Sequence, residues 1–246
     1  MVSSSNAISN TIGASISGVT NTLTVTNPSN TASSAARTSI TVGGSSSGDP
    51  TINFNVSGVT NFELGIDNSA SDSLKLSATA SLGTTDTFIM TTDGYRTLPL
   101  QPAFSARHSV TQSNATGNGT VATVSYTTVI FDQNSDYNGT STFTSPATGR
   151  YLFCGGVDMR GFTAAFSSMQ LTLVTSNRSY LLGVLQSPGK VFNPAPDVSS
   201  QGVQTCDMDL GDTAHVTGES SGSTKTISFF SPGALGVHFF SGCLLV

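Results

Sequence analysis

The sequence predicts an all-β protein. Only 9% of its residues are Asp, Glu, Lys or Arg, which is too few for long amphipathic helices with charged outer faces. Ser, Thr and Asn take the places of charged residues, and Thr and Val alternate with small polar residues in a pattern that fits pleated strands. The 25 glycines, many beside Asn, Asp or Pro, supply turns between short strands.

Residues 1–48 are expected to attach the protein to a larger assembly. Arg37 is the single charged side chain in this range, and Ser, Thr, Asn, Ala and Gly dominate it. The apolar surface of this segment is too small to offset the entropy lost when the chain becomes ordered. We therefore expect disorder or partner-dependent order. The pentapeptide SGVTN occurs at 17–21 and again at 57–61, which suggests a structural repeat.

Residues 49–101 predict a β-rich stalk or collar. Short segments with alternating apolar residues run from Ile52 to Met90, separated by turns such as Asp67-Asn68 and Asp93-Gly94. Each segment offers one narrow apolar face, and a sheet of this size is marginally stable alone. We therefore expect a slender trimeric stalk whose apolar residues are buried against other chains.

Residues 102–246 predict a two-sheet sandwich or jelly roll, because longer alternating segments follow one another with Gly, Asn and Pro between them. Two of these segments, 150–154 and 237–246, are apolar on both faces. Such a strand must be covered on both faces. We expect the terminal segment to be a central strand, and a second copy of the chain to supply part of the cover.

Charge and cysteine content exclude several kinds of partner. A net charge of −5 and an isoelectric point near 4.9 argue against a nucleic-acid-binding surface. No run approaches the length of about 18 apolar residues that membrane insertion needs, and the N-terminus has no export signal. The three cysteines, Cys154, Cys206 and Cys243, lie in apolar segments and are expected to be buried thiols, with one disulfide as the alternative. Assembly in a host cytoplasm followed by release, as for a virus particle, fits this combination.

A family motif covers the C-terminal part. An F-D step is followed by F-T-x-P-x-x-G-x-Y-x-F, a G-D turn and F-S-G-x-L-L. In this order and spacing, residues 102–246 resemble the globular head domain of the complement component one-q and tumour-necrosis-factor superfamily. The positions that carry the resemblance are Phe131-Asp132, Phe143, Thr144, Pro146, Gly149, Tyr151, Phe153, Gly211-Asp212, Phe240, Ser241, Gly242, Leu244 and Leu245.

The resemblance implies a ten-strand jelly roll that assembles as a compact homotrimer. It places aromatic residues of the inner sheet near the three-fold axis, which predicts a trimer core of Tyr151, Phe153, Phe240 and Leu244. The collagen-like stalk of the animal proteins is absent, which argues against a complement or cytokine role. Residues 48–94 resemble instead the stalk of fibre-type virion proteins from tailed bacterial viruses.

Catalysis, cofactors and metals are not predicted. The three histidines are scattered, no G-x-S-x-G turn is present, and His238 is expected to be structural. Loop carboxylates are expected to be solvated or to cap turns, with a calcium site or a glycan-cleaving pair as alternatives. These carboxylates are Asp132, Asp136, Asp207, Asp209 and Asp212.

Two loops are candidates for contact with a receptor. Arg160 and Phe162 follow a predicted central strand, and Phe192 lies in the longest irregular stretch. An exposed aromatic residue beside polar side chains is a common contact for carbohydrate or protein. The alternative is that both phenylalanines anchor their own loops.

The sequence therefore predicts a homotrimeric virion fibre protein of a tailed bacteriophage. Residues 1–48 would contact other virion proteins, and the head would bind a glycan or protein on the host surface. A purely structural head decoration or tail-tip protein is the alternative. A secreted bacterial adhesin or glycan-cleaving enzyme is a third, less favoured interpretation.

Overall fold

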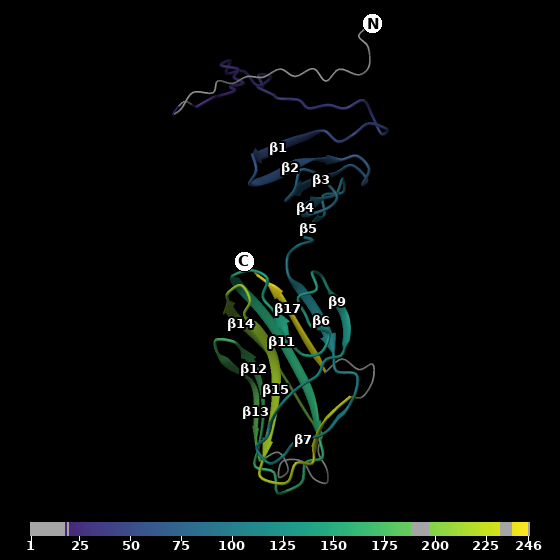
Figure 1. Ribbon diagram of the computed structural model, residues 1–246, viewed down its shortest axis with the longest axis vertical. Coiled ribbons are helices and arrows are strands. Elements are labelled where there is room, and N and C mark those ends of the chain that lie inside the picture. Colours follow the sequence, from purple (N-terminus) through teal and green to yellow (C-terminus); the bar gives the residue numbers. More distant parts are fainter. Residues whose placement is uncertain (1–17, 19, 188–196, 232–237, 246) are drawn as a thin grey trace.

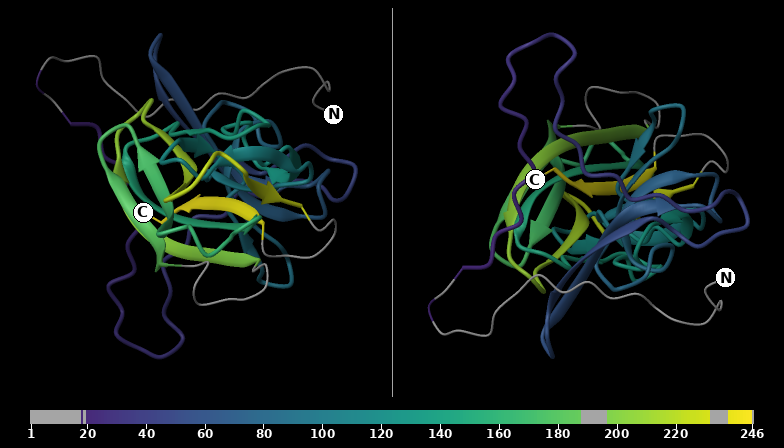
Figure 2. Two further views of the ribbon diagram at one scale, coloured as in Figure 1. Left: turned by 90° about the horizontal axis from the view of Figure 1, so that it is seen from below. Right: turned by 90° about the horizontal axis from the view of Figure 1, so that it is seen from above.

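The computed structural model describes residues 18, 20–187, 197–231 and 238–245. Three parts follow one another along its long axis: an extended N-terminal segment, a small sheet and a larger body (Figure 1). The described residues up to 50 contain no strand, and they loop out beyond the outline of the sheets (Figure 2). Every regular element is a strand, which confirms the all-β prediction. No helix in the described ranges is long and apolar enough to cross a membrane.

The small sheet is a five-stranded antiparallel meander in chain order. The predicted alternating segments all form strands in it. A tight turn at Gly58, with φ of +74°, joins the first two strands and requires a residue without a Cβ penalty. The strands are β1 (Thr51–Val56), β2 (Thr60–Asp67), β3 (Ser73–Ser77), β4 (Asp86–Met90) and β5 (Arg96–Thr97).

The larger body, which we call the head, is a jelly-roll sandwich of two antiparallel sheets, as predicted. Its strands are β6 (Ala103–Arg107), β7 (Gln112–Thr116), β8 (Val121–Thr123), β9 (Thr128–Asp132), β10 (Phe143–Thr144), β11 (Gly149–Arg160), β12 (Ser168–Thr175), β13 (Ser179–Gln186), β14 (Val198–Met208), β15 (Thr213–Ser221), β16 (Ile227–Phe230) and β17 (Phe239–Leu244). The ten strands that the resemblance implies become twelve among the described residues, because the very short β8 and β10 are counted.

The larger sheet has the order β7-β16-β11-β17-β6-β9, with β14 paired to the other side of β11. The smaller sheet has the order β10-β15-β12-β13, with β8 paired to β15. Strand β17 lies between β11 and β6, so the prediction of a central strand near the C-terminus is confirmed for its described residues. Strand β11 is the longest in the head and has partners on both edges.

A cluster of aromatic rings fills one half of the head's core. The Phe104 ring stacks on Tyr137 and Phe143 at centroid distances of 5.0 and 5.1 Å. Phe240 meets Phe104 edge-on at 4.9 Å, and Phe153 lies 5.9 Å from Phe240. Rings in these orientations add to the stability that burial alone gives. All five are buried within one chain.

The three cysteines are free, as predicted. Cys206 is buried, whereas Cys154 and Cys243 are only half-buried on the outer face of the larger sheet, so the prediction of burial is right for one of the three. The outer position follows from the register, because residues on either side of Phe153 point away from the core that Phe153 fills.

The small sheet has a buried ionic core. The Nζ of Lys75 lies 2.7 Å from Oδ2 of Asp67 and 3.0 Å from Oδ2 of Asp86, and all three side chains are more than nine-tenths buried. The other oxygen of Asp67 accepts hydrogen bonds from the backbone and hydroxyl of Ser69. Asp86 accepts from the backbone N–H of Gly83. Buried charges persist only with such full pairing.

Gly242 is required by the aromatic cluster. A Cβ at this position would lie 2.5 Å from Cδ1 of Phe153 and 2.9 Å from Cε1 of Phe104, and both rings are fixed by neighbouring rings. We predict that Gly242→Ala lowers the free energy of unfolding by about 1 to 3 kcal/mol. Chemical denaturation measures it, with Ser241→Ala on the outer face as control. Equal stability of the two variants would contradict this role.

The ionic core generates a second prediction. Lys75→Met leaves two buried carboxylates without a cation, so the small sheet should lose about 3 to 5 kcal/mol of stability at neutral pH. Hydrogen exchange of the amides of β2 to β4 in the full chain measures the loss. Lys225→Met removes an exposed charge of the same kind and is the control.

The same variant should change the pH dependence. The hydrogen bond from Lys75 is the main cause that lowers the pKa of Asp67 below 3.8, against the opposing effect of burial. A lowered native pKa stabilises above the unfolded value and is lost as the pH falls through the native value. Native protection of the sheet should therefore decrease below pH 3.8, whereas the variant should gain protection as its carboxyls take up protons. A difference that stays constant with pH would contradict the ionic core.

Candidate interaction surfaces

The predicted trimer core requires correction. Tyr151, Phe153 and Phe240 are fully buried inside one head, so they have no surface left to offer to another chain. The register explains the outcome, because the face of β11 that carries Tyr151 and Phe153 points toward the smaller sheet. Leu244 is half-buried and packs at the margin of the same core. The residues that remain available on the opposite face are Leu152 and Cys154, each half-buried.

Of the predicted receptor contacts that the structure describes, Phe162 is buried and the Arg160 side chain is 36% exposed. Phe162 is buried and meets Phe166 edge-on at 5.4 Å, so it anchors its own loop. The Nε of Arg160 lies 3.2 Å from Asp158 and 3.0 Å from Asp197, and its guanidinium stacks 3.2 Å above the Phe230 ring. These contacts leave Arg160 fixed within the head. Phe192 lies outside the described residues.

Two of the five loop carboxylates, Asp132 and Asp212, cap turns as predicted, whereas Asp207 pairs with Arg178 and one oxygen of Asp136 is buried without a hydrogen-bond partner. Asp132 accepts hydrogen bonds from the backbone N–H groups of Asp136 and Tyr137. Asp212 accepts from the backbone N–H of Asp209 and from the Asn177 amide. Among the described residues, no three His, Cys, Asp or Glu side chains are placed to share a metal ion.

His238 is a structural residue, as predicted. It is buried, and its Nδ1 accepts a hydrogen bond of 3.1 Å from the backbone N–H of Asp158. Burial is the main cause that lowers its pKa to about 4, and the nearby His108 and Arg160 add to the effect. The neutral imidazole accepts a hydrogen bond from the backbone N–H of Asp158 and so connects the segment before β17 to β11.

An apolar surface runs across the outside of the larger sheet. The register places Val203, Cys154, Ser241, Ser105 and Phe131 in one row from β14 to β9. Val203 and Phe131, at the two ends of the row, are large and apolar, and they are 62% and 51% exposed. The residues between them are small. The surface is thus shallow in the middle and apolar at both ends.

The edge of the sandwich beside Val203 is also apolar. Strands β13 and β14 approach each other closely there, and Gly183 and Gly202 allow this approach. A Cβ on either glycine would collide with the facing strand. Leu181, on the outer side of β13, is 57% exposed. Leu181 and Val203 therefore present apolar side chains on either side of one edge. Exposed clusters of this kind mark interaction sites on soluble proteins.

The connection between the small sheet and the head is held by hydrogen bonds. The Gln133 amide donates to the carbonyls of Leu98, Pro99 and Gln101, and the Gln101 amide donates to the carbonyl of Leu244. A pocket of about 510 Å³ lies at this junction. The apolar residues that line it are Leu98, Leu100, Pro102, Pro146, Ala147, Leu244 and Leu245.

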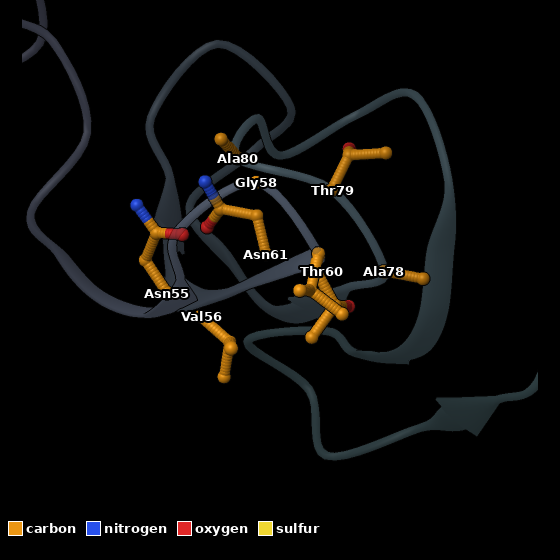
Figure 3. Close-up of a pocket in the computed structure, with 9 residues that line it drawn as sticks. Asn55, Val56, Gly58, Thr60, Asn61, Ala78, Thr79 and Ala80 are labelled. Carbon is orange, nitrogen blue, oxygen red and sulfur yellow. The ribbon is translucent and has the colours of Figure 1, made fainter.

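A second pocket, of about 530 Å³, lies at the tip of the β1–β2 hairpin (Figure 3). Asn55 and Asn61 stand beside each other on the paired strands, and the segment from Ala78 to Ala80 forms the opposite wall. The lining offers amide and hydroxyl groups and contains no ionisable side chain. Its polar groups can form hydrogen bonds only, and Val56 and Val59 add apolar lining.

Comparison with known proteins finds no family model and no curated protein that matches this chain. Solved structures do match. The globular domain of zebrafish complement 1qA protein is 17% identical, covers 59% of this chain and 98% of its own, and has a TM-score of 0.38. Murine APRIL, crystallised at pH 8.5, is 13% identical, covers 59% of this chain and 99% of its own, and has a TM-score of 0.40. The chain is similar to these proteins in fold alone.

Proposed function

We propose that this chain is a homotrimeric structural fibre protein of a tailed bacteriophage, with a head that binds the surface of the host cell. The linear order of the parts carries the proposal: an extended N-terminal segment, a slender sheet and a compact head succeed one another along one axis (Figure 1). In this arrangement residues 1–48 contact other virion proteins, residues 49–101 form the stalk and the head projects.

The trimer in this proposal is supported by the apolar surfaces of the head. The aromatic core is complete within one chain, yet Val203, Leu181 and Phe131 remain exposed. The head therefore has two apolar patches. One is the edge with Leu181 and Val203, and the other is the sheet face around Phe131 at the far end of the row. A contact between an edge and a face is heterologous, and such contacts close into a ring when the rotation allows it. Three copies in the ring is the number that the family resemblance implies.

Host binding is assigned to the end of the head that is remote from the small sheet (Figure 1). Three loops meet there and hydrogen-bond to one another, through Gly117 with Ser220, Ser223 with Gly117 and Ser167 with Ser221. In a trimer this end presents three copies of each loop in one direction. Three weak sites on one rigid particle raise the apparent affinity through effective concentration.

The trimer is tested by Val203→Asp, which places a charge on the proposed contact and leaves the core untouched. We expect native mass spectrometry to give a trimer for the natural sequence and mainly monomer for the variant. Val110→Asp is the control, because Val110 is equally exposed but lies in the loop between β6 and β7. A monomer for the natural sequence would contradict the homotrimer.

Host binding is tested with the fluorescently labelled full chain on cells of the host strain. We expect the trimer to bind, and Val203→Asp to lose about 100-fold or more in apparent affinity because avidity is lost. Periodate or protease treatment of the cells distinguishes a glycan from a protein receptor. If the trimer binds no cells, the protein is a structural decoration or cap, and the receptor-binding role is wrong.

A further inference from the structure

In the small sheet the polar side chains of β3 are buried and the apolar side chains are exposed or half-buried, which is the reverse of the usual arrangement. On one face, the register brings ten apolar side chains together, and every one of them is exposed or only half-buried. On the other face, the polar residues of β3 and their neighbours are buried. The apolar set is Ile52, Phe54, Val56, Phe62, Leu64, Ile66, Leu74, Leu76, Phe88 and Met90.

The chain uses its own loops to cover the polar face. The loop after β2 returns over Asp67, through bonds from Ser69. The loop after β3 is held by mutual bonds among the hydroxyls of Ser77, Thr79 and Thr85. A bulge between β3 and β4 then places Asp86 on the polar face although Phe88 lies on the apolar one. Both connecting loops therefore lie on the side of the ionic core.

The apolar face is open to solvent at β1 and the start of β2, where four of its side chains are exposed, and its other six side chains are half-buried. Phe54 and Phe62 sit opposite each other on β1 and β2, and they are 56% and 41% exposed. The preceding segment does not fold over them, since its own apolar side chains Leu23, Val25 and Ile40 are exposed as well. Strand β1 is also an edge strand of the sheet. An exposed apolar edge of this kind associates with another chain unless it is covered.

The residue composition of the apolar face indicates which kind of partner can cover it. Its one charged neighbour is Arg96, which lies opposite Met90 at the margin next to the head. An acidic or basic partner would bury its charges unpaired there, and a sugar would lose its hydrogen bonds to water without replacement. An identical face has neither cost. Ten such side chains provide several hundred Å², on the same order as the roughly 800 Å² per partner of a standard interface.

We propose that the apolar face of β1 to β4 is a self-association surface, on which the same faces of the other copies pack to form a shared core. The proposal rests on the homotrimer proposed above, because the heads hold the copies at high effective concentration. Each sheet then has two cores: the ionic one inside the chain and the apolar one between chains. The stalk is thus expected to fold fully only after the copies have come together.

The test is photo-crosslinking in the full chain, with p-benzoylphenylalanine in place of Phe54. The matched control carries the same residue in place of Asn55, which is exposed on the opposite face of the same strand. We expect irradiation to give covalent dimers and trimers on a denaturing gel from position 54, with at least a fivefold lower yield from position 55. Native mass spectrometry of each sample establishes its oligomeric state.

The outcomes separate this proposal from the trimer itself. A trimer that crosslinks equally from both positions, or from neither, overturns the stalk interface and leaves the trimeric head standing. A crosslink from position 54 to residues 20–50 of the same chain also overturns it, because the face would then be covered from within. A monomer in native mass spectrometry overturns both proposals together.

Discussion

Apolar surface that one chain leaves uncovered is the constraint on which the structure depends. In the small sheet the two loops lie over the polar face, and the face bearing Phe54 stays open. In the head the aromatic cluster is closed, yet Phe131 and Val203 remain outside it. Burial of apolar area is the main favourable contribution to folding and to association. Both parts therefore leave apolar surface uncovered, and in the proposed trimer other copies of the chain cover it in the small sheet and in the head.

The distribution of charge follows from this constraint. With only 9% charged residues, the chain has few groups that repel a like surface, and it places three of them, Asp67, Lys75 and Asp86, in a closed triad. A buried ionic group contributes more to defining one arrangement than to net stability in some proteins. Here the triad lies on the face of the sheet that the connecting loops cover. The apolar face stays free for the proposed assembly.

Much of the fold follows from the sequence. Period-two alternation identifies β1 to β4, and the apolar character of both faces of residues 237–246 identifies β17 as a central strand. Alternation separates two faces but does not say which one fills the chain's own core. The family resemblance places Tyr151 and Phe153 near a trimer axis, and the structure shows them inside one head. The same limit applies to Phe162, because an aromatic residue in a loop has no periodic neighbours that show its direction.

The proposed interfaces of the head and of the small sheet differ in how complete the core is within a single chain. The head has a complete core within one chain, so in the proposed trimer it would fold before its edge-to-face contacts form. The small sheet has the triad of Asp67, Lys75 and Asp86 as its internal core, so in the proposed assembly its apolar half would form between chains. Assembly would therefore proceed from the head toward the N-terminus. In the proposed fibre, that order would bring three N-terminal segments together only in completed trimers, and attachment to the particle would then be restricted to correctly assembled fibres.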